Sequence, residues 1–265
     1  QYLPNRLGYV YARASLWVAT HRASRVLTVS ETSKRDILRY FRVPESKIDV
    51  IYNAIDERLG GAPSDEEVGQ VRERYQLYDP FVLYAGNIKP HKNLERLIEA
   101  FNLMRQDSPH LANVQLLIIG DEISKYATLR RAVHRHKLHK HVRFFGFVSD
   151  QTLAALYRLA DVFVFPSLYE GFGMPILEAM QYGLPVAVSD IPVFHEVAGE
   201  AAMYFDKDDI SSMTESLARI ITDKELRRRL MAAGKARSER FTWDENATNV
   251  YEAIMSSLND IRATR

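Results

Sequence analysis

The stretch DVFVFPSLYEGFGMPILEAMQYGLPVAVSD, residues 161–190, contains two short apolar runs with a glycine-rich loop and a helical pattern between them. The runs Val162–Phe165 and Val186–Ser189 are almost uniformly apolar, which is typical of strands buried on both faces of a sheet. Pro175 suits the first turn of a helix, because its missing N–H costs nothing there. The stretch therefore predicts a strand–helix–strand unit of a parallel sheet.

The same alternation of apolar runs and amphipathic stretches continues along the chain, which indicates an α/β fold with a Rossmann-like, doubly wound parallel sheet. We predict further strands at Arg25–Val29, Ile48–Tyr52, Phe81–Ala85, Val114–Ile119 and Val142–Phe145. We predict helices at Ser33–Phe41, Asn93–Arg105, Lys125–Leu138, Asp150–Ala160 and Pro175–Tyr182.

The pattern divides the chain into four parts. Residues 1–55 supply only two strands, too few for a stable sheet, so we expect a remnant of an N-terminal Rossmann-like domain or an edge added to the main one. Residues 56–79 are expected to be a linker and a helix, with Ser64 or Asp65 as the N-cap. Residues 80–240 are expected to form a Rossmann-like domain. Residues 241–265 are expected to be a helix, capped by Thr242. Because the first residue is Gln1, we expect a fragment or a processed product.

The composition is that of an ordinary globular protein and excludes several other classes. Of the 265 residues, 46% are apolar and 26% are charged, and the net charge of +1 gives no overall field that favours nucleic acid. The absence of cysteine excludes a disulfide scaffold and fits a reducing compartment, so we expect a cytoplasmic protein. Contact with the inner face of the membrane is left open.

The loops that follow the predicted strands are the first candidates for a site, because ligands bind beyond the carboxyl ends of strands in open α/β sheets. Glycines such as Gly86 and Gly120 begin these loops, where the backbone can approach a ligand closely. The loop GNIKPHKN, residues 86–93, places Lys89 and Lys92 just before a helix, where a diphosphate would be favoured. The alternative is a solvated loop whose lysines serve solubility.

Two carboxylates flank the glycine-rich loop in the opening stretch. We expect Glu170 to lie in the loop and Glu178 on about the first turn of the helix, so that both can point at one pocket above the sheet. Carboxylates of this kind accept hydrogen bonds from adjacent hydroxyls of a ribose or a hexose. The alternative is that Glu170 caps the helix and Glu178 complements its dipole. The neighbouring aromatics Tyr169 and Phe172 either line a sugar or base pocket or pack beneath the loop.

A basic run, LRRAVHRHKLHKHVRF, contains four histidines, His134, His136, His139 and His141. Metal-binding helices favour ligands three or four residues apart with a third ligand nearby, so this spacing does not favour a metal site. We expect a solvated face, with an acidic surface or lipid headgroups as the alternative partner.

Taken in order, several blocks closely resemble the group 1 (family 4) retaining glycosyltransferases over roughly residues 20–260. The most specific element is E-x7-E, here Glu170 to Glu178. The segments IKPHKN and IPVFHEVAGEAAMYF are most similar to bacterial mannosyl- and rhamnosyl-type members. The supporting blocks are VLTVSETSKRDILRYFRVPESKIDVIYNAID, FVLYAGNIKPHKNLERLIEAF, VQLLIIGDE and the segment from HVRFFGFVSD to EAAMYF.

The resemblance implies a GT-B architecture, in which two Rossmann-like domains face a cleft and the C-terminal domain, here residues 80–240, binds the nucleotide-sugar donor. It also implies that the helix over residues 241–265 packs back toward the N-terminal segment. It implies that Lys92 holds the diphosphate and Glu170 contacts the transferred sugar, both as catalytic residues, while Glu178 binds ribose hydroxyls. Residues 146–148 would border the base, and backbone amides at 172–174 would meet the phosphates. No metal is expected, because side chains and a helix dipole neutralise the leaving diphosphate. The other donor-binding positions implied are Gly86, Asn87, Lys89, Gly120, Val148, Phe172, Gly173 and Met174.

The chain also departs from the family pattern. Asn87 stands where many members carry an arginine, so Lys89 or His91 would have to supply the charge. The long N-terminal segment that holds the acceptor site in family members is expected to be absent and to be supplied in cis or in trans. We predict transfer of a hexose, from GDP-mannose or a similar donor, to a carbohydrate or lipid-linked acceptor with retention, as in polysaccharide biosynthesis. The alternatives are a non-catalytic nucleotide-sugar-binding module and a sugar-nucleotide epimerase.

Overall fold

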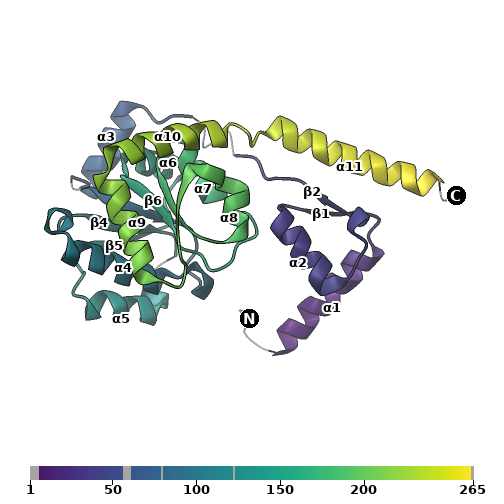
Figure 1. Cartoon of the computed structure of the whole chain (residues 1–265), viewed down its shortest axis with the longest axis horizontal. Coiled ribbons are helices and arrows are strands. Elements are labelled where there is room, and N and C mark those ends of the chain that lie inside the picture. The colour runs from purple at the N-terminus through teal and green to yellow at the C-terminus, as the bar shows by residue number, and fades with distance from the viewer. Residues whose placement is uncertain (1–5, 56–60, 79, 122, 264–265) are drawn as a thin grey trace. The chain divides into compact units, whose positions relative to one another are not determined.

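A computed structural model of the chain describes residues 6–55, 61–78, 80–121 and 123–263. The chain forms two compact units (Figure 1), one made of Gln1–Ala54 with Phe241–Arg265 and the other of Ile55–Arg240. Among the described helices, none combines the length and the apolar character that crossing a membrane requires. Parts of the predicted linker, residues 56–60 and 79, lie outside the described residues.

The larger unit is built on a six-stranded parallel sheet with the strand order β5-β4-β3-β6-β7-β8. This is the order of a doubly wound Rossmann-like sheet, so the predicted fold class is confirmed. The central strands are buried throughout, as their continuous apolar runs indicated. The strands are β3 (Phe81–Ala85), β4 (Gln115–Ile119), β5 (Val142–Gly146), β6 (Val162–Phe165), β7 (Val186–Ser189) and β8 (Ala202–Phe205).

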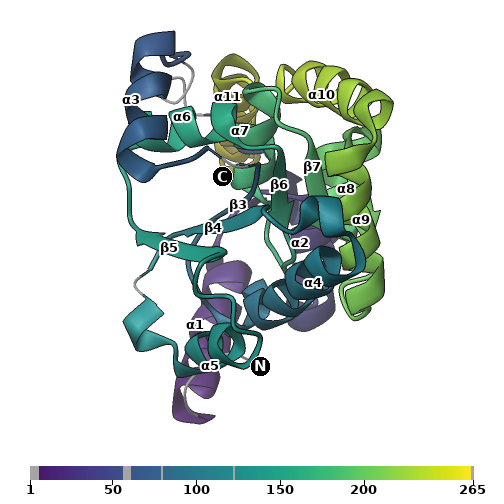
Figure 2. The same ribbon diagram turned by 90° about the vertical axis from the view of Figure 1, so that its left-hand side faces the viewer.

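Helices cover both faces of this sheet (Figure 2). The helices α4 (Leu94–Asp107), α5 (Ala127–Arg135) and α9 (Ile210–Thr222) lie on one face. The other face carries α3 (Asp65–Tyr75), α6 (Asp150–Leu159) and α7 (Met174–Gln181), and α10 (Lys224–Ser238) packs against α7. Of the two predicted caps, Ser64 is the one used, because its hydroxyl accepts a hydrogen bond from the Glu67 amide while the Glu67 carboxylate accepts one from the Ser64 amide.

The structure corrects the predicted elements between Ser189 and Phe241 and at the ends of α5. The prediction placed no element between Ser189 and Phe241, and so it missed β8, whose sequence AMYF contains no β-branched residue and is only half-buried. It also missed α8 (Pro192–Ala198), α9 and α10. The predicted helix Lys125–Leu138 is shorter at both ends, because Ile123–Lys125 forms a 3-10 turn and Lys137 adopts a left-handed conformation with φ of 54°.

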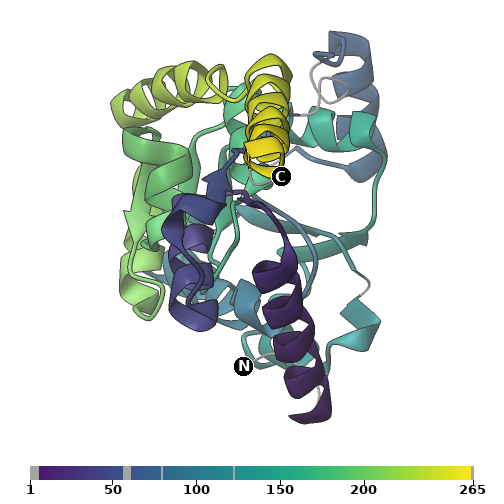
Figure 3. The same ribbon diagram turned by 90° about the vertical axis from the view of Figure 1, so that its right-hand side faces the viewer.

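The smaller unit contains α1 (Arg6–Arg22), β1 (Val26–Thr28), α2 (Glu31–Phe41), β2 (Ile48–Val50) and α11 (Trp243–Ala263), and Figure 3 shows its helices from a second side. The two strands pair in parallel, as expected from a helix–strand–helix–strand segment. The hydroxyl of Thr242 accepts a hydrogen bond from the Glu245 amide (3.3 Å), as expected of the cap of α11. The amide side chain of Asn246 donates to the backbone oxygen of Tyr52 (2.6 Å), which connects α11 to the segment after β2.

A substitution of Gly120, at the carboxyl end of β4, tests how closely the backbone packs at this edge of the sheet. The φ of Gly120 is +150°, and a Cβ atom there would lie 2.1 Å from the backbone oxygen of Gly86. We expect Gly120→Ala to lower the free energy of unfolding by more than about 2 kcal/mol, because backbone must move. The control Gly69→Ala, where nothing lies within 4 Å inside α3, should raise it by about 0.5–1 kcal/mol. Urea unfolding followed by circular dichroism measures both, and equal effects would show that the close approach is not present.

Candidate functional site

At one point of the sheet the direction of the chain connections reverses. Strands β3 and β6 are neighbours, but the chain leaves β3 toward α4 and β4, and leaves β6 toward α7 and β7 on the other side. The loops that follow the two strands, residues 86–93 and 166–173, therefore meet at the position where the strand order reverses. In doubly wound sheets this switch point is where ligands bind.

The pairing of β3 with β6 is shorter than the other pairings around it. Its ladder consists of Val82 with Val162 and Leu83 with Phe163, whereas β3 pairs with β4 over its whole length. The stacked rings of Tyr84 and Phe165 follow, with centroids 5.9 Å apart. The floor beneath the two loops is therefore aromatic.

Lys92 and Glu170 form an ion pair above this floor. The side chains are 9% and 14% exposed, and the ammonium group of Lys92 also lies 4.7 Å from the centroid of the Phe165 ring. Both charges are thus largely removed from water. A buried ion pair of this kind persists only with good geometry and further hydrogen bonds. The structure brings together the two residues that the sequence singled out as catalytic candidates.

Further bonds hold the two loops in this arrangement. The amide of Leu168 donates to the backbone oxygen of His91 (2.8 Å), which ties the 3-10 turn Pro90–Lys92 to the loop after β6. The hydroxyl of Ser167, itself fully buried, donates to Oε1 of Glu170 (2.7 Å). Burial, and next the charge of Lys92, lower the pKa of His91, which favours the neutral imidazole beside the pair.

Glu178 lies on the second turn of α7 rather than on about the first, as the sequence had suggested. Its Oε2 atom accepts a hydrogen bond from the hydroxyl of Tyr157 (2.9 Å), a buried residue of α6. Burial first, and then the charge of Glu178, raise the pKa of Tyr157. The ring of Tyr182 stacks on Tyr157 with centroids 5.8 Å apart. Tyr157 therefore holds this carboxylate, and Tyr182 packs against Tyr157.

Three glycines form the edge of the sheet next to the switch point. Gly86, Gly120 and Gly146 end or follow three adjacent strands, and all have positive φ. The amide of Gly86 donates to the oxygen of Ile119, and the amide of Gly120 donates to the oxygen of Gly146, both at 3.0 Å. At this edge the backbone of one loop approaches the backbone of the next, and the approach of a ligand to these glycines stays a prediction.

The first turn of α7 gives a mixed result for the three amides predicted to meet phosphates. Gly173 has φ of 109° and begins the helix without a side-chain cap. Pro175 has no amide hydrogen and Ile176 donates to Gly173 (3.0 Å), so Met174 is the residue of this turn whose amide has no acceptor inside the helix. Phe172 is only 4% exposed, so it packs beneath the loop and does not line a pocket as a free aromatic, whereas Tyr169 is exposed.

The remaining predicted positions lie around the same edge. Asn87 and Lys89 are exposed, and the backbone oxygen of Asn87 accepts a hydrogen bond from the Tyr84 hydroxyl (2.8 Å). Lys89 lines a cavity of about 510 Å³, and neither Glu170 nor Glu178 is among the described residues of its wall. Val148 is half-buried in the loop after β5.

The basic segment, residues 123–149, contains seven lysines and arginines and no acidic residue. Its histidines are exposed or half-buried, and the rings of His134 and His139 lie edge to face 5.7 Å apart. In the described part of the chain, no three histidine, aspartate or glutamate side chains gather as metal ligands would. The solvated face, its alternative partners and the independence from metal stay predictions.

Sequence reasoning did not identify the residues that support the candidate site. Ser167, Tyr157 and Phe165 hold the two glutamates and the lysine in place, as described above. Asp121, which follows β4, accepts hydrogen bonds from the Ile88 amide (3.2 Å) and the Tyr126 hydroxyl (3.0 Å). The position of Ser167 and Asp121 directly after strands was the available signal; Tyr157 had none, because it looks like one more apolar position of α6.

Nucleotides bind at the switch point of doubly wound sheets in many proteins. The chain belongs to the glycosyltransferases: the sequence model described as "Glycosyl transferases group 1" matches residues 70–237, and the one described as "Glycosyltransferase Family 4" matches residues 1–59.

Two curated relatives are mannosyltransferases by name. The chain is 31% identical over 245 residues to the O-antigen chain mannosyltransferase B of Escherichia coli, covering 92% of this chain and 63% of that protein. It is 35% identical over 211 residues to the O-antigen chain mannosyltransferase RfbU of Salmonella typhimurium, covering 80% and 55%. The chain therefore spans between half and two thirds of the length of these relatives.

Solved structures share the fold. The Anabaena protein Alr3699/HepE, in complex with UDP and glucose, is 22% identical with a TM-score of 0.81, covering 93% of this chain and 67% of that chain. A glycosyltransferase from Rickettsia africae is 19% identical with a TM-score of 0.77, covering 97% and 68%. The likeness confirms the GT-B fold class predicted from the sequence.

Breaking the ion pair from one side should be costly. We expect Lys92→Met and Glu170→Leu each to lower the free energy of unfolding by roughly 3 kcal/mol, because each leaves one charge without its partner in a largely dry place. The double variant should lose less than the sum of the two, since both charges are then gone. Urea unfolding of the four proteins measures this cycle, and strictly additive losses would mean that the two side chains do not interact.

The buried tyrosine beneath Glu178 predicts a loss of stability at alkaline pH. The pKa of Tyr157 is raised in the folded protein, whereas tyrosine in the unfolded chain ionises near pH 10. The free energy of unfolding therefore keeps the full contribution of Tyr157 below about pH 10 and falls as the pH rises above that value. Tyr157→Phe should reduce this fall by up to about 1.4 kcal/mol per pH unit. The exposed residue Tyr78 provides the control Tyr78→Phe. Urea unfolding between pH 8 and 11 gives the slopes; equal slopes for the two variants would contradict the assignment.

Proposed function

We propose that this chain contributes the donor site of a retaining hexosyltransferase that uses a nucleoside-diphosphate sugar, with mannose as the transferred sugar. The observation that carries the proposal is the Lys92–Glu170 pair at the switch point of a doubly wound sheet. Family membership supports a glycosyltransferase, and the names of the relatives support mannose. GDP-mannose is the donor that we propose on this basis.

The diphosphate would lie over the loop 86–93, where positive charge is available. Lys92 is the buried cation of this loop and Lys89 is an exposed one, which compensates for the arginine that Asn87 replaces. The amide of Met174 and the dipole of α7 add a further anion-binding element. Glu178 would accept hydrogen bonds from ribose hydroxyls, and residues 146–148 would border the base.

The reaction we propose breaks the bond between C1 of the sugar and the diphosphate oxygen, and that oxygen takes the electron pair. Lys92 stabilises the negative charge that develops on the leaving diphosphate. The acceptor hydroxyl attacks C1 from the same face, and its proton passes to the departing phosphate oxygen, so the configuration is retained. Glu170 stabilises the positive charge that develops on the sugar ring.

Glu170 is better suited to electrostatic stabilisation than to nucleophilic attack. Its Oε1 atom already accepts a hydrogen bond from Ser167 and pairs with the ammonium of Lys92. Both contacts withdraw electron density from the carboxylate, which makes it a weaker nucleophile but leaves its charge beside the reacting centre. The front-face mechanism is therefore the one that we propose over a covalent intermediate.

We also propose an acceptor and a location for the chain. The acceptor is a carbohydrate or a lipid-linked glycan, and the rest of an acceptor domain would be provided in cis or in trans, because the chain spans only part of its relatives. A cytoplasmic location, where the chain meets its donor, belongs to the same proposal. A binding module without activity is the alternative that a turnover assay separates from it.

The experiment is calorimetric titration of the chain with GDP-mannose, UDP-glucose and a dTDP-sugar, followed by an assay of transfer to a mannoside acceptor. We expect Glu178→Ala to weaken binding of the preferred nucleotide sugar by about 1–3 kcal/mol, the range for losing hydrogen bonds to a charged group. The exposed residue Glu200 provides the control Glu200→Ala, which should bind as the wild type does.

Failure of all three nucleotide sugars to bind would overturn the proposed donor site, and an unchanged dissociation constant for Glu178→Ala would remove that residue from it. Binding without transfer by the isolated chain would leave the donor site intact and assign catalysis to the chain together with an acceptor domain.

A further inference from the structure

A cavity of about 510 Å³ lies beside the switch point, at the start of α4 and α5. Its volume is within the range of roughly 300–1,000 Å³ that small-molecule sites occupy. The floor is apolar and includes the buried residues Ile88, Leu94 and Leu129, whereas polar side chains such as Lys89, Glu95 and Thr128 stand around the rim. An apolar floor with a few polar groups at the rim is the usual composition of a ligand site.

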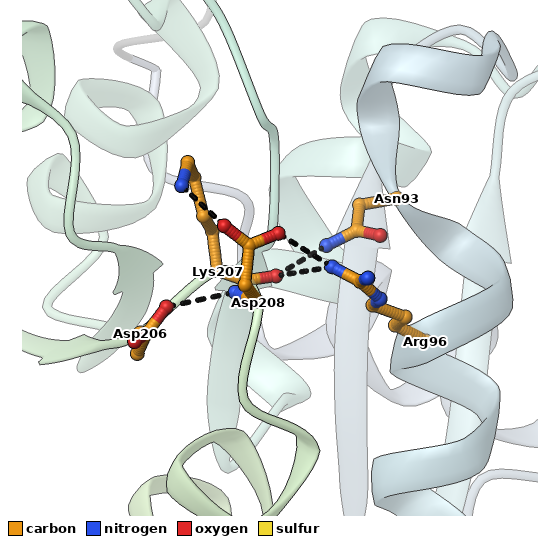
Figure 4. Close-up of polar contacts among 5 residues, drawn as sticks. All are labelled: Asn93, Arg96, Asp206, Lys207 and Asp208. Carbon is orange, nitrogen blue, oxygen red and sulfur yellow. Dashed lines mark hydrogen bonds and ion pairs between the residues drawn. The ribbon is translucent and has the colours of Figure 1, made fainter.

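One wall of this cavity is held by contacts between the start of α4 and the loop before α9 (Figure 4). The amide side chain of Asn93 donates to the backbone oxygen of Lys207 (3.1 Å), and the guanidinium of Arg96 donates to the same oxygen (3.2 Å). Arg96 also pairs with the carboxylate of Asp208 (2.7 Å), whose amide donates to the Asp206 side chain (2.8 Å). The loop before α9 is thereby fixed against the start of α4.

The opposite wall is held by a single carboxylate. Asp121 accepts hydrogen bonds from the Ile88 amide and the Tyr126 hydroxyl, so that the loops after β3 and β4 are joined. Ile88 and Tyr126 both line the cavity. Because each wall is fixed by bonds that need no ligand, the cavity is preformed, which reduces the entropy that a ligand must overcome on binding.

The charges on the rim decide which ligands suit the cavity. Two cations, Lys89 and Arg96, and two anions, Glu95 and Asp208, line it, so their formal charges cancel. A phosphate would meet both carboxylates, and a cationic ligand would meet both basic groups. A neutral polyhydroxyl ligand avoids either penalty, because each hydroxyl both donates and accepts hydrogen bonds. The ring of Tyr126 and the apolar floor can cover the carbon-bound hydrogens of such a ligand.

Two segments of the chain lead from the cavity wall to the candidate catalytic residues. Leu168 lines the cavity, and Glu170 follows two residues later. Pro90 also lines it, and Lys92 follows two residues later in the same 3-10 turn. The hydrogen bond from Leu168 to His91 joins these two segments. A ligand in the cavity would therefore lie next to the loops that hold the ion pair, on the flank of α4.

We infer that this cavity is a saccharide subsite, which binds a neutral sugar unit of the acceptor glycan while the donor occupies the switch point. The inference rests on the proposed function for its role in transfer, but sugar binding itself can be measured without any nucleotide. It assigns acceptor contacts to the donor-binding unit, and it predicts that glycan and nucleotide bind at the same time.

The test is ligand-observed NMR and calorimetry of the whole 265-residue chain with a linear α-mannotriose, alone and with saturating GDP. We expect the trisaccharide to bind in both conditions with a similar dissociation constant. Thr128→Trp places a large side chain at the exposed rim, and Glu95→Ala removes a hydrogen-bonding carboxylate there; each should weaken trisaccharide binding roughly tenfold.

Matched controls lie on the same two helices. Arg130→Trp changes an exposed residue of α5, and Glu99→Ala changes an exposed residue one turn farther along α4; neither residue lines the cavity, so both variants should bind the trisaccharide as the wild type does. All four variants should keep the thermal midpoint of the wild type within a few degrees and the same affinity for GDP.

The inference is overturned if the wild-type chain does not bind the trisaccharide, if GDP displaces it, or if Thr128→Trp and Glu95→Ala bind it unchanged. Loss of trisaccharide binding with GDP binding intact would leave the proposed donor site standing. Trisaccharide binding at this cavity without any affinity for GDP would support the subsite and count against the proposed function.

Discussion

The ion pair between Lys92 and Glu170 is the constraint on which the site depends. It exists because β3 and β6 are adjacent in the sheet although their connections leave in opposite directions, so that two loops distant in sequence must share one place. The two strands pair only over Val82–Val162 and Leu83–Phe163, and the aromatic rings of Tyr84 and Phe165 follow this short ladder. A charge pair on such a floor is held strongly, because little water is present to screen it.

Different residues around this pair hold the charged side chains in place and keep the edge of the sheet free of side chains. The support consists of buried hydroxyls that fix the carboxylates, with Ser167 on Glu170 and Tyr157 on Glu178. Glycines at the ends of β3, β4 and β5 keep side chains away from the edge of the sheet that a ligand would approach. Charged groups that are held in place before a ligand binds are already organised for a ligand that develops charge during the reaction. The cavity beside α4 is held in the same manner, by Asp121 on one wall and by Asp208 on the other.

The central part of the fold could be predicted from the sequence because its strands are buried on both faces. The runs FVLYA, VFVF and VAVS gave the bounds of β3, β6 and β7 correctly. The edge strand β8 was missed, because a half-buried strand with little β-branched character gives no clear pattern. For the site, the spacing of Glu170 and Glu178 and the lysine before a helix pointed to the two loops that the fold brings together at the switch point. The sequence could not show that Lys92 pairs with Glu170, or that Phe172 is buried, because both depend on how loops far apart in the chain pack together.

A crystal structure of the chain with a bound nucleoside diphosphate tests the central claim most directly. The account predicts the β-phosphate within about 3 Å of the Lys92 ammonium, hydrogen-bond distance, with Glu170 still beside that lysine. A diphosphate bound at the amino-terminal edge of the sheet, or at the carboxyl-terminal edge but with Lys92 and Glu170 both out of reach, would contradict it.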